Sequence, residues 1–277
     1  MVKGYRGRYL ALLIFFQFSK NPAAMQIPRK AVEWLSRNII IKRKIRTGKK
    51  VVPLFVTPDA QLKYWKPGHN AFNRDLINLA EKHLTPDSII WDVGANVGEF
   101  SFVASAIAHR GVVVSIEADI WLASILRKTT RLKEHHNRSV HILPAAISNE
   151  NSAAPFFIAA RGRASNALEK AGGRSQMGGI REKQYVPTLT LDTLLNAFPS
   201  PDFVKIDVEG AEFMALQGGT RLISLIRPRF YIEVGPATSK PVFEIFRSAD
   251  YHAFGPRGKR LLHNCARNTF FVPAEKC

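Results

Sequence analysis

The sequence is short of three things: cysteine, long apolar runs, and acidic residues near its N-terminus. Its 277 residues include only two cysteines, Cys265 and Cys277, which excludes a framework of several disulfides and any zinc site built from four cysteines. So few thiols favour a reducing compartment. The most apolar stretch covers residues 9–18 (YLALLIFFQF), whereas a helix that spans a bilayer needs roughly 20 such residues. A polytopic membrane protein is therefore excluded.

The overall composition is that of a folded chain. Hydrophobic residues make up 46% of the sequence and the mean hydropathy is −0.09, which suits a sizeable core and excludes an intrinsically disordered protein. The length suits one large domain or two small ones, at roughly 150 residues per domain. We divide the chain into a basic N-terminal extension, residues 1–50, and a main domain, residues 51–277.

Positive charge is concentrated in the N-terminal extension. The chain has a formal net charge of +18, and residues 1–50 contain 13 Lys and Arg against one acid, Glu33. Such a segment favours an anionic partner, which is a lipid surface, a nucleic acid or an acidic glycan. The alternative is a solvated arm with no fixed partner. The charge run at residues 42–50 predicts a surface segment that joins the extension to the main domain.

The apolar stretch at residues 9–18 allows several interpretations. It follows three basic residues, Lys3, Arg6 and Arg8, and its length suits the core of a signal peptide, which is ~7–15 residues long. It also suits a helix that lies in a membrane interface, or a helix packed on the main domain. Because the chemistry inferred below needs a cofactor of the cytosol, we favour the last two interpretations. We expect a cytoplasmic protein, either free or associated with an anionic membrane surface through residues 1–50.

The main domain alternates short apolar runs with helical patterns. Continuous apolar runs between helices indicate βαβ units and a parallel sheet covered on both faces. Strands are predicted at residues 88–93, 112–117, 140–143, 203–208 and 230–234, with a final pair at 251–254 and 269–272. Helices are predicted at residues 99–109, 120–133 and 212–225. The pattern therefore predicts an α/β fold.

An irregular stretch separates the third and fourth predicted strands. Residues 155–187 contain one strand-like run, at 156–159, followed by glycine-rich sequence. Four arginines lie within or beside this part, namely Arg161, Arg163, Arg174 and Arg181. A long loop inside a compact domain is usually functional or disordered. The stretch is thus either a lid over a substrate or a disordered surface insertion.

A glycine turn joins the first predicted strand to the first helix, in the sequence DVGANVGE at residues 92–99. Its glycines allow the backbone to approach a ligand, and the helix N-terminus offers free N–H groups. The turn lacks the G-x-G-x-x-G spacing of a dinucleotide loop, so a carboxylate can sit here instead of a phosphate. The acid that precedes the turn can accept from an ammonium group. An amino-acid moiety therefore fits Asp92, Gly94, Ala95, Asn96 and Gly98.

A second acid, Glu117, ends the second predicted strand. At this position a carboxylate can accept two hydrogen bonds from the hydroxyls of a ribose. A ligand with an amino-acid end and a ribose end is S-adenosyl-L-methionine. The alternative is that the turn only caps a helix and that Glu117 is a surface acid.

Acidic residues also follow the fourth predicted strand, which ends KIDVEGAE at residues 205–212. Open α/β sheets bind ligands at the carboxyl ends of their strands. Strand alternation puts Lys205, Asp207 and Glu209 on one side, and Glu233 ends the fifth strand beside them. This cluster can carry acid–base chemistry. The alternative is that Glu212 caps the next helix and that Lys205 only neutralises Asp207.

These segments together resemble the FkbM family of S-adenosylmethionine-dependent methyltransferases. In the family's order they are IIWDVGANVGEFS at 89–101, SIEAD at 115–119, LPAAIS at 143–148, LTLDTLL at 189–195 and DFVKIDVEGAEFMALQGG at 202–219. The resemblance covers roughly residues 85–235 and none of residues 1–70. It implies a Rossmann-like, seven-stranded class I methyltransferase sheet with helices on both faces, here with a helical and basic N-terminal extension. It also implies O-methylation of a sugar, a glycolipid or another natural-product hydroxyl.

The resemblance implies where the cofactor binds. The turn at residues 92–98 would hold the methionine part and Glu117 the ribose, while Ala145 and Ala146 would lie near the adenine. The sequence departs from the family in one respect, because Ala118 stands where a proline usually follows the acid.

The resemblance also implies that Asp207 and Glu209 face the methyl group and the acceptor. Either carboxylate would remove the proton of an acceptor hydroxyl, and such help is typically worth ~10²–10⁴ in rate. Lys205 would orient the acid or lower its pKa. Asp207 and Glu233 could hold a divalent metal, but the sequence does not establish this and we assign no metal site.

Two other functions fit parts of the sequence. The basic extension suits an RNA ribose 2′-O-methyltransferase, in which Lys205, Asp207, Lys240 and Glu233 would form the lysine–acid set. However, no N/D-P-P-Y/F motif follows the fourth strand and no RNA-binding signature is present, so a small-molecule or glycan acceptor is favoured over nucleic acid. The second is a non-catalytic, membrane-associated protein that retains the fold, against which the turn, Glu117 and Asp207 argue.

Overall fold

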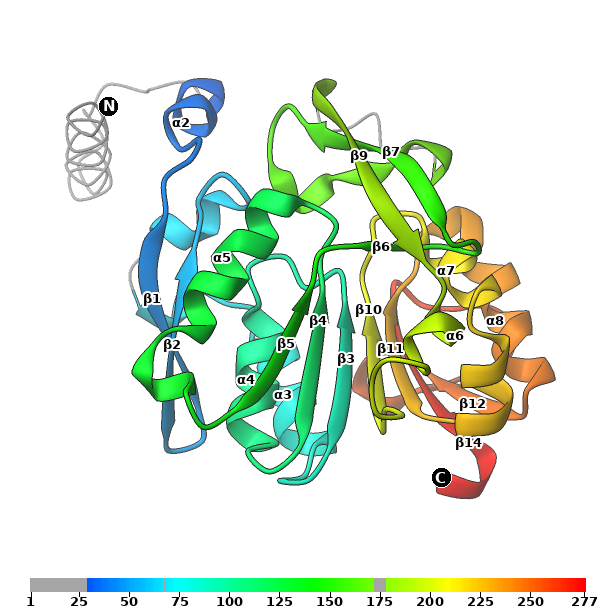
Figure 1. Cartoon of the computed structure of the whole chain (residues 1–277). Helices are drawn as coiled ribbons and strands as arrows, with labels where there is room; N and C mark the ends of the chain where they lie inside the picture. Colours follow the sequence, from blue (N-terminus) through cyan, green and yellow to red (C-terminus); the bar gives the residue numbers. More distant parts are fainter. Residues whose placement is uncertain (1–28, 67, 172–177) are drawn as a thin grey trace.

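A mixed sheet of eight strands forms the centre of the computed structural model, which describes residues 29–66, 68–171 and 178–277 (Figure 1). Across the sheet the strands are β13 (Arg260–Leu261), β12 (Tyr251–Phe254), β14 (Asn268–Pro273), β11 (Arg229–Glu233), β10 (Phe203–Ile206), β3 (Ile89–Val93), β4 (Val112–Ile116) and β5 (Ser139–Leu143). The five strands from β11 to β5 are parallel, and β14 runs antiparallel to β11. The predicted methyltransferase sheet is confirmed, with β13 as a two-residue addition at its edge.

Alternation of side chains along the strands divides the core into two halves. Ile90 and Phe203 belong to one buried cluster, whereas Trp91 and Val204 belong to the other. The first face is covered by α3 (Arg74–His83), α4 (Glu99–Ile107) and α5 (Ile120–Thr130). The second is covered by α6 (Leu191–Leu194), α7 (Glu212–Gln217) and α8 (Ser239–Ser248). Both faces of the sheet are therefore buried, which explains why the strands are continuous apolar runs.

The helix predicted at residues 212–225 is shorter in the structure. Helix α7 ends at Gln217, and a π-helical turn, η7 (Leu222–Ile226), follows after a break. Gly218 lies in the break, where a β carbon would come within 2.3 Å of the backbone oxygen of Ser148. The close packing requires glycine, and glycine weakens the helix at the same point.

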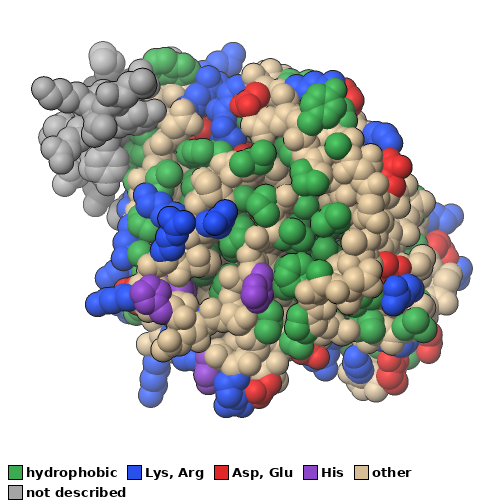
Figure 2. Space-filling model, viewed as in Figure 1, with side chains coloured by type: hydrophobic (Ala, Val, Ile, Leu, Met, Phe, Trp, Pro, Cys, Tyr) green, Lys and Arg blue, Asp and Glu red, His purple; other side chains and the backbone are tan. Residues whose placement is uncertain are grey.

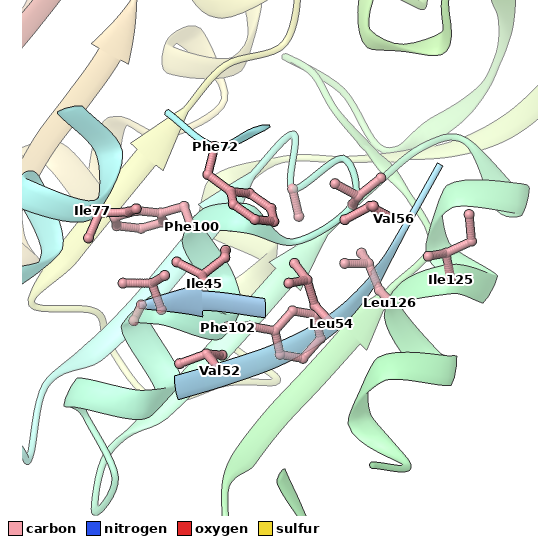
Figure 3. Packing of buried hydrophobic residues seen from close by; sticks show 14 of the residues in the cluster. Ile45, Val52, Leu54, Val56, Phe72, Ile77, Phe100, Phe102, Ile125 and Leu126 are labelled. Atoms are coloured by element: carbon pink, nitrogen blue, oxygen red, sulfur yellow. The ribbon is translucent and has the colours of Figure 1, made fainter. Parts of the chain in front are cut away.

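Before the sheet, the chain forms α2 (Arg29–Leu35) and an antiparallel hairpin of β1 (Ile41–Thr47) and β2 (Lys50–Val56). The surface segment predicted at residues 42–50 is therefore wrong in part. Its charged side chains are mostly exposed, but Ile45 is buried with Leu54 in the cluster that contains Phe102 and Leu126 (Figure 3). The hairpin crosses the boundary predicted after residue 50 and contributes to the core of the main domain.

Residues 1–28, with the apolar stretch at 9–18 and its basic flank, lie outside the described residues. Within the described part of the chain, no helix combines the length and the apolar character needed to cross a membrane.

The stretch between β5 and β10 forms a second sheet instead of an irregular loop (Figure 1). Its strand order is β6 (Ala146–Ile147), β9 (Ile180–Leu189), β7 (Ser152–Ala159) and β8 (Ala167–Leu168). The strand predicted at residues 156–159 is the end of β7. Strand β9 escapes prediction because most of its side chains are exposed or half-buried, so its sequence has no apolar pattern. Residues 172–177, including Arg174, lie outside the described residues.

Candidate active site

A cavity of about 330 Å³ opens at the carboxyl ends of the central strands, beside the second sheet. From the glycine turn and the neighbouring strand ends, its wall contains Gly94, Ala95, Asn96, Glu117, Ala145 and Ala146. From β10, β11 and the segment after β10, its wall contains Lys205, Asp207, Glu209 and Glu233. The structure thus brings the predicted site residues together around one cavity, except Asp92 and Gly98, which are not in its wall.

Asp92 contacts other protein groups instead of the cavity. It is fully buried, and the strand register pairs it with Lys205 on β10. Its Oδ1 lies 3.2 Å from the Nζ of Lys205, and its Oδ2 accepts a 2.5 Å hydrogen bond from the hydroxyl of Ser101. The sequence predicts that Asp92 accepts from the ammonium group of a ligand, but in the structure it holds the ammonium group of Lys205.

Gly94 must be glycine for two reasons. Its φ of +77° lies in the left-handed region, and a β carbon would come within 1.9 Å of the backbone oxygen of Asp207. The backbone N–H groups of Gly94 and Ala95 both donate to the oxygen of Ile116, at 3.0 and 2.9 Å. The turn is therefore held against the ends of both β4 and β10, and its peptide groups remain in the cavity wall.

The second glycine of the turn, Gly98, has a different environment. Its φ is +85°, and a β carbon there would meet the side chains of Phe102 at 2.5 Å and Leu126 at 2.6 Å. Both side chains belong to the core cluster under the hairpin. Gly98 therefore allows close packing at the start of α4, and not the approach of a ligand as its position in the sequence predicts.

Glu117 is held rigidly in the cavity wall. Its side chain is only 7% exposed, and its two oxygens accept hydrogen bonds from the backbone of Asp119 at 2.8 Å and of Asn96 at 2.7 Å. Burial raises the pKa of Glu117 from 4.5 to about 7, although both hydrogen bonds favour the charged form and lower it. Glu117, directly after β4, and the turn after β3 are thus joined by a hydrogen bond.

The segment between β7 and β8 supplies two polar cavity residues, of which the sequence singles out only Arg163. The Oδ2 of Asp119 accepts hydrogen bonds from Arg163 at 2.5 Å and from Asn166 at 2.8 Å, and both of these residues line the cavity. Arg163 also donates to Asp59 at 3.1 Å, and its guanidinium lies 4.6 Å from the ring of Trp121. The buried guanidinium therefore ties the second sheet to the N-terminus of α5.

The other described arginines of this stretch fasten the second sheet to the N-terminal segment. Arg161 pairs with Glu33 of α2 at 3.1 Å, and Arg181 pairs with Asp59 at 3.0 Å. Neither arginine lines the cavity. The predicted lid over a substrate is thus a fixed wall in which only Arg163, of the described arginines, reaches the cavity.

Charged groups of both signs surround the end of the cavity at β10 and β11. The Nζ of Lys205 lies 3.7 Å from Asp207, whose side chain is 33% exposed, and Glu233 pairs with Arg267 at 2.8 Å. Burial alone would lower the pKa of Lys205, but Asp92 and Asp207 outweigh it and raise that pKa. Among the described residues, no group of three or more His, Cys, Asp or Glu side chains could hold a metal ion.

The segment before α3 closes the cavity from the remaining side. Glu99, the first residue of α4, accepts hydrogen bonds from Lys63 at 3.1 Å and from the hydroxyl of Tyr64 at 3.3 Å, and a further one from the backbone of Asn73. All four residues line the cavity. The sequence does not reveal them, because these partners come from a segment with no resemblance to the family.

Comparison with known protein families finds a match over much of the chain. The model of the family described as "Methyltransferase FkbM domain" matches residues 92–253, which is more than half of the chain. A similar curated protein is the hexuronic acid methyltransferase AglP of Haloferax volcanii, 25% identical over 156 residues. The match covers 55% of this chain and 59% of that protein, so the chain spans less than two thirds of the relative.

Comparison with solved structures gives methyltransferases as well. The FkbM methyltransferase of Methylobacillus flagellatus is 18% identical, with a TM-score of 0.44, over 68% of this chain and 44% of that one. The magnesium protoporphyrin IX methyltransferase of Synechocystis, solved with bound S-adenosylmethionine, is 13% identical, with a TM-score of 0.41, over 72% of this chain and 76% of that one.

Proposed function

The chain belongs to the FkbM family of S-adenosylmethionine-dependent methyltransferases, and from this premise we propose that it methylates a hydroxyl group of a sugar, a glycolipid or another natural product. The observation that carries the proposal is the row of carboxylates along one cavity, from Glu117 to Asp207, Glu209 and Glu233. Carboxylates accept hydrogen bonds from hydroxyl groups, which both a ribose and a sugar acceptor present.

The residues of the cavity fit the cofactor. The fixed carboxylate of Glu117 is an acceptor for the ribose hydroxyls, as at the corresponding position of other open α/β sheets. Ala118, Ala146, Phe156 and Leu168 form a small apolar cluster that reaches the cavity wall beside Glu117, which suits the faces of an adenine ring. Gly94, Ala95 and Asn96 line the cavity near Lys205 and Asp207, where the methionine part would lie, although their backbone N–H groups already donate to Ile116 and Glu117.

The chemistry requires alignment and removal of one proton. When bound, S-adenosylmethionine supplies a methyl group that its sulfonium has already activated. The protein must hold the acceptor oxygen in line at roughly 3 Å. We assign proton removal to Asp207, because it is partly exposed at the cavity while the ammonium group of Lys205 stabilises its charged form. Asp92, on the other side of Lys205, keeps that lysine in place.

The acceptor would lie at the end of the cavity formed by Glu209, Glu233 and Arg267. Paired carboxylate and guanidinium groups bind vicinal hydroxyls by complementary hydrogen bonds, which supports a sugar. The similarity to a hexuronic acid methyltransferase also supports a sugar, at a level of identity that leaves the individual sugar open.

A transfer assay tests the proposal. The full chain would be incubated with S-adenosylmethionine labelled in its methyl group and with neutral hexosides, hexuronosides, glycolipids and transcribed RNA. We expect label in a sugar hydroxyl, and a loss of roughly 10²-fold or more for Asp207→Asn. Binding of the cofactor, measured by calorimetry, should remain.

Glu182→Gln is the matched control, because it removes an exposed carboxylate of β9 that does not line the cavity. Label in the ribose of RNA, and in no sugar, would replace the proposal by the RNA alternative. A folded chain that binds no S-adenosylmethionine would instead support the non-catalytic alternative.

A further inference from the structure

One surface of the described domain exposes basic side chains with almost no acids between them. Strand β1 alternates buried and exposed residues. The surface, which we call the basic face, combines exposed residues of β1, of α5 and of the segment after α5 that ends with the turn η3 (Lys133–His135), namely Lys42, Lys44, Arg46, Arg127, Lys128, Arg131 and Lys133. The one acid of these elements that the structure exposes is Glu134. In Figure 2, Lys and Arg side chains accordingly follow the left side of the molecule, over α5 and the hairpin.

Contacts between the elements make the basic face continuous. The backbone N–H of Phe55 on β2 donates to the hydroxyl of Thr129 on α5 at 2.9 Å, and the Nζ of Lys128 lies 4.4 Å from the Phe55 ring. The register of the hairpin pairs Phe55 with Lys42. The Nε2 of His135 in η3 lies 2.7 Å from the backbone oxygen of Pro53, which the register of the hairpin pairs with Lys44, so β1 and η3 are also close to each other.

The charge of this face is directed to solvent. The side chains of Lys44, Arg46 and Arg131 make no hydrogen bond or ion pair with any residue that the structure describes. Some arginines elsewhere on the surface have carboxylate partners, as in the pairs of Arg227 with Glu275 and Arg247 with Glu244. A cluster of like charges without internal partners creates a positive potential that attracts an anionic surface.

We propose that the basic face binds the anionic surface of a phospholipid bilayer. Basic residues near an anionic leaflet each contribute to such binding, and a polybasic surface anchors a protein stably when an apolar segment adds to it. The sequence contains such a segment at residues 9–18, with Lys3, Arg6 and Arg8 before it. This segment precedes β1 in the sequence.

A lipid surface fits this face better than a single-stranded nucleic acid does. Proteins that bind single-stranded nucleic acids combine positive charge with exposed aromatic rings on which bases stack. Phe55 of β2, the aromatic side chain that Lys128 of the basic face contacts, is only partly exposed and lies under the ammonium group of that lysine. This inference does not depend on which acceptor the enzyme methylates.

Sedimentation with vesicles tests the proposal on the full chain. Vesicles of phosphatidylcholine alone would be compared with vesicles containing 30% phosphatidylglycerol, a composition of roughly the charge density of anionic membranes. We expect binding to the anionic vesicles that weakens in high salt, because screening shortens the range of the charges. The triple variant Lys44→Glu, Arg46→Glu and Arg131→Glu should lose about tenfold or more of this binding.

The matched control carries the same change of net charge at the opposite edge of the sheet. It consists of Arg257→Glu, Lys259→Glu and Arg260→Glu, between β12 and β13 and at the start of β13, where all three residues are exposed. The control should bind anionic vesicles like the unaltered chain. Both triple variants should bind S-adenosylmethionine with unaltered affinity, which verifies that they are folded.

Three results would overturn the proposal. Equal losses in the two triple variants would mean that net charge, and not this face, determines binding. Equal binding to both kinds of vesicle would assign the interaction to apolar contacts alone. Tight binding of an RNA oligonucleotide that the basic-face variant loses, together with no binding to anionic vesicles, would identify the face as a nucleic-acid surface.

Discussion

The change Gly94→Ala tests the close approach of the glycine turn to β10, and the chain offers a control for it. Gly94 and Gly48 both have a left-handed backbone, with φ of +77° and +52°. A β carbon at Gly48 has nothing within 4 Å, whereas one at Gly94 would lie 1.9 Å from the backbone oxygen of Asp207. The two alanine variants therefore share the conformational cost and differ in the collision.

The expected losses of stability follow from the conformational cost and from the collision of the β carbon. An alanine in the left-handed region costs ~1–2 kcal/mol, which is the whole loss expected for Gly48→Ala. Relief of overpacking against a backbone atom costs a further ~1–3 kcal/mol, so Gly94→Ala should lose roughly 2–5 kcal/mol. Moving the turn away from the backbone oxygen of Asp207 should also displace Asp207, whose N–H donates to Val93 at 3.0 Å. A misplacement of about 1 Å at a reacting centre can reduce the rate ~10²-fold.

Urea unfolding, calorimetric titration of S-adenosylmethionine and the transfer assay measure these three effects separately. Gly48→Ala should keep the affinity for the cofactor and the turnover of the unaltered chain. The reasoning would be refuted if Gly94→Ala were no less stable than Gly48→Ala and bound the cofactor with unaltered affinity, because the turn would then have room for a β carbon.

Three further predictions concern the charged groups around the cavity. Lys205→Met should destabilise the fold by ~3–5 kcal/mol in urea unfolding, because it leaves the carboxylate of Asp92 buried without its cation. The double variant Lys205→Met with Asp92→Asn should recover part of this loss of stability. If it recovers none, the pairing of Lys205 with Asp92 is contradicted. Arg163→Met should weaken binding of S-adenosylmethionine in calorimetry. Asp59→Asn should weaken it too, because Asp59 holds Arg163 without lining the cavity. If only Arg163→Met had an effect, Arg163 would act through the cavity wall and not through its pairing with Asp59. The pKa of Glu117 is raised from 4.5 to about 7, so the contribution of this group to stability is complete below about pH 4.5 and is lost as the pH rises to about 7. In urea unfolding, the stability of Glu117→Gln should therefore decline less over this range than that of the unaltered chain. Binding of the cofactor to the unaltered chain should strengthen as the carboxylate ionises.

Patterns within short segments of the sequence determined the central sheet and the glycine turn. Continuous apolar runs and helical spacing depend only on the local backbone and on which faces are covered, so the strands and their order along the chain could be predicted. The turn after β3 was recognisable because its glycines reflect a local requirement of the backbone, as the φ of Gly94 demonstrates. Glu117, Asp207 and Glu233 lie at the cavity because strand ends of a parallel sheet meet at one edge.

The tertiary structure alone decided how these residues are paired. Asp92 faces Lys205 because the register of β3 and β10 places them side by side, and Arg163 reaches Asp119 because the second sheet folds over α5. Strand β9 is defined by pairing with β7 and not by an apolar pattern of its own. Ion pairs and strand pairing join residues that are far apart along the chain, and only the complete fold sets the distances on which their energies depend.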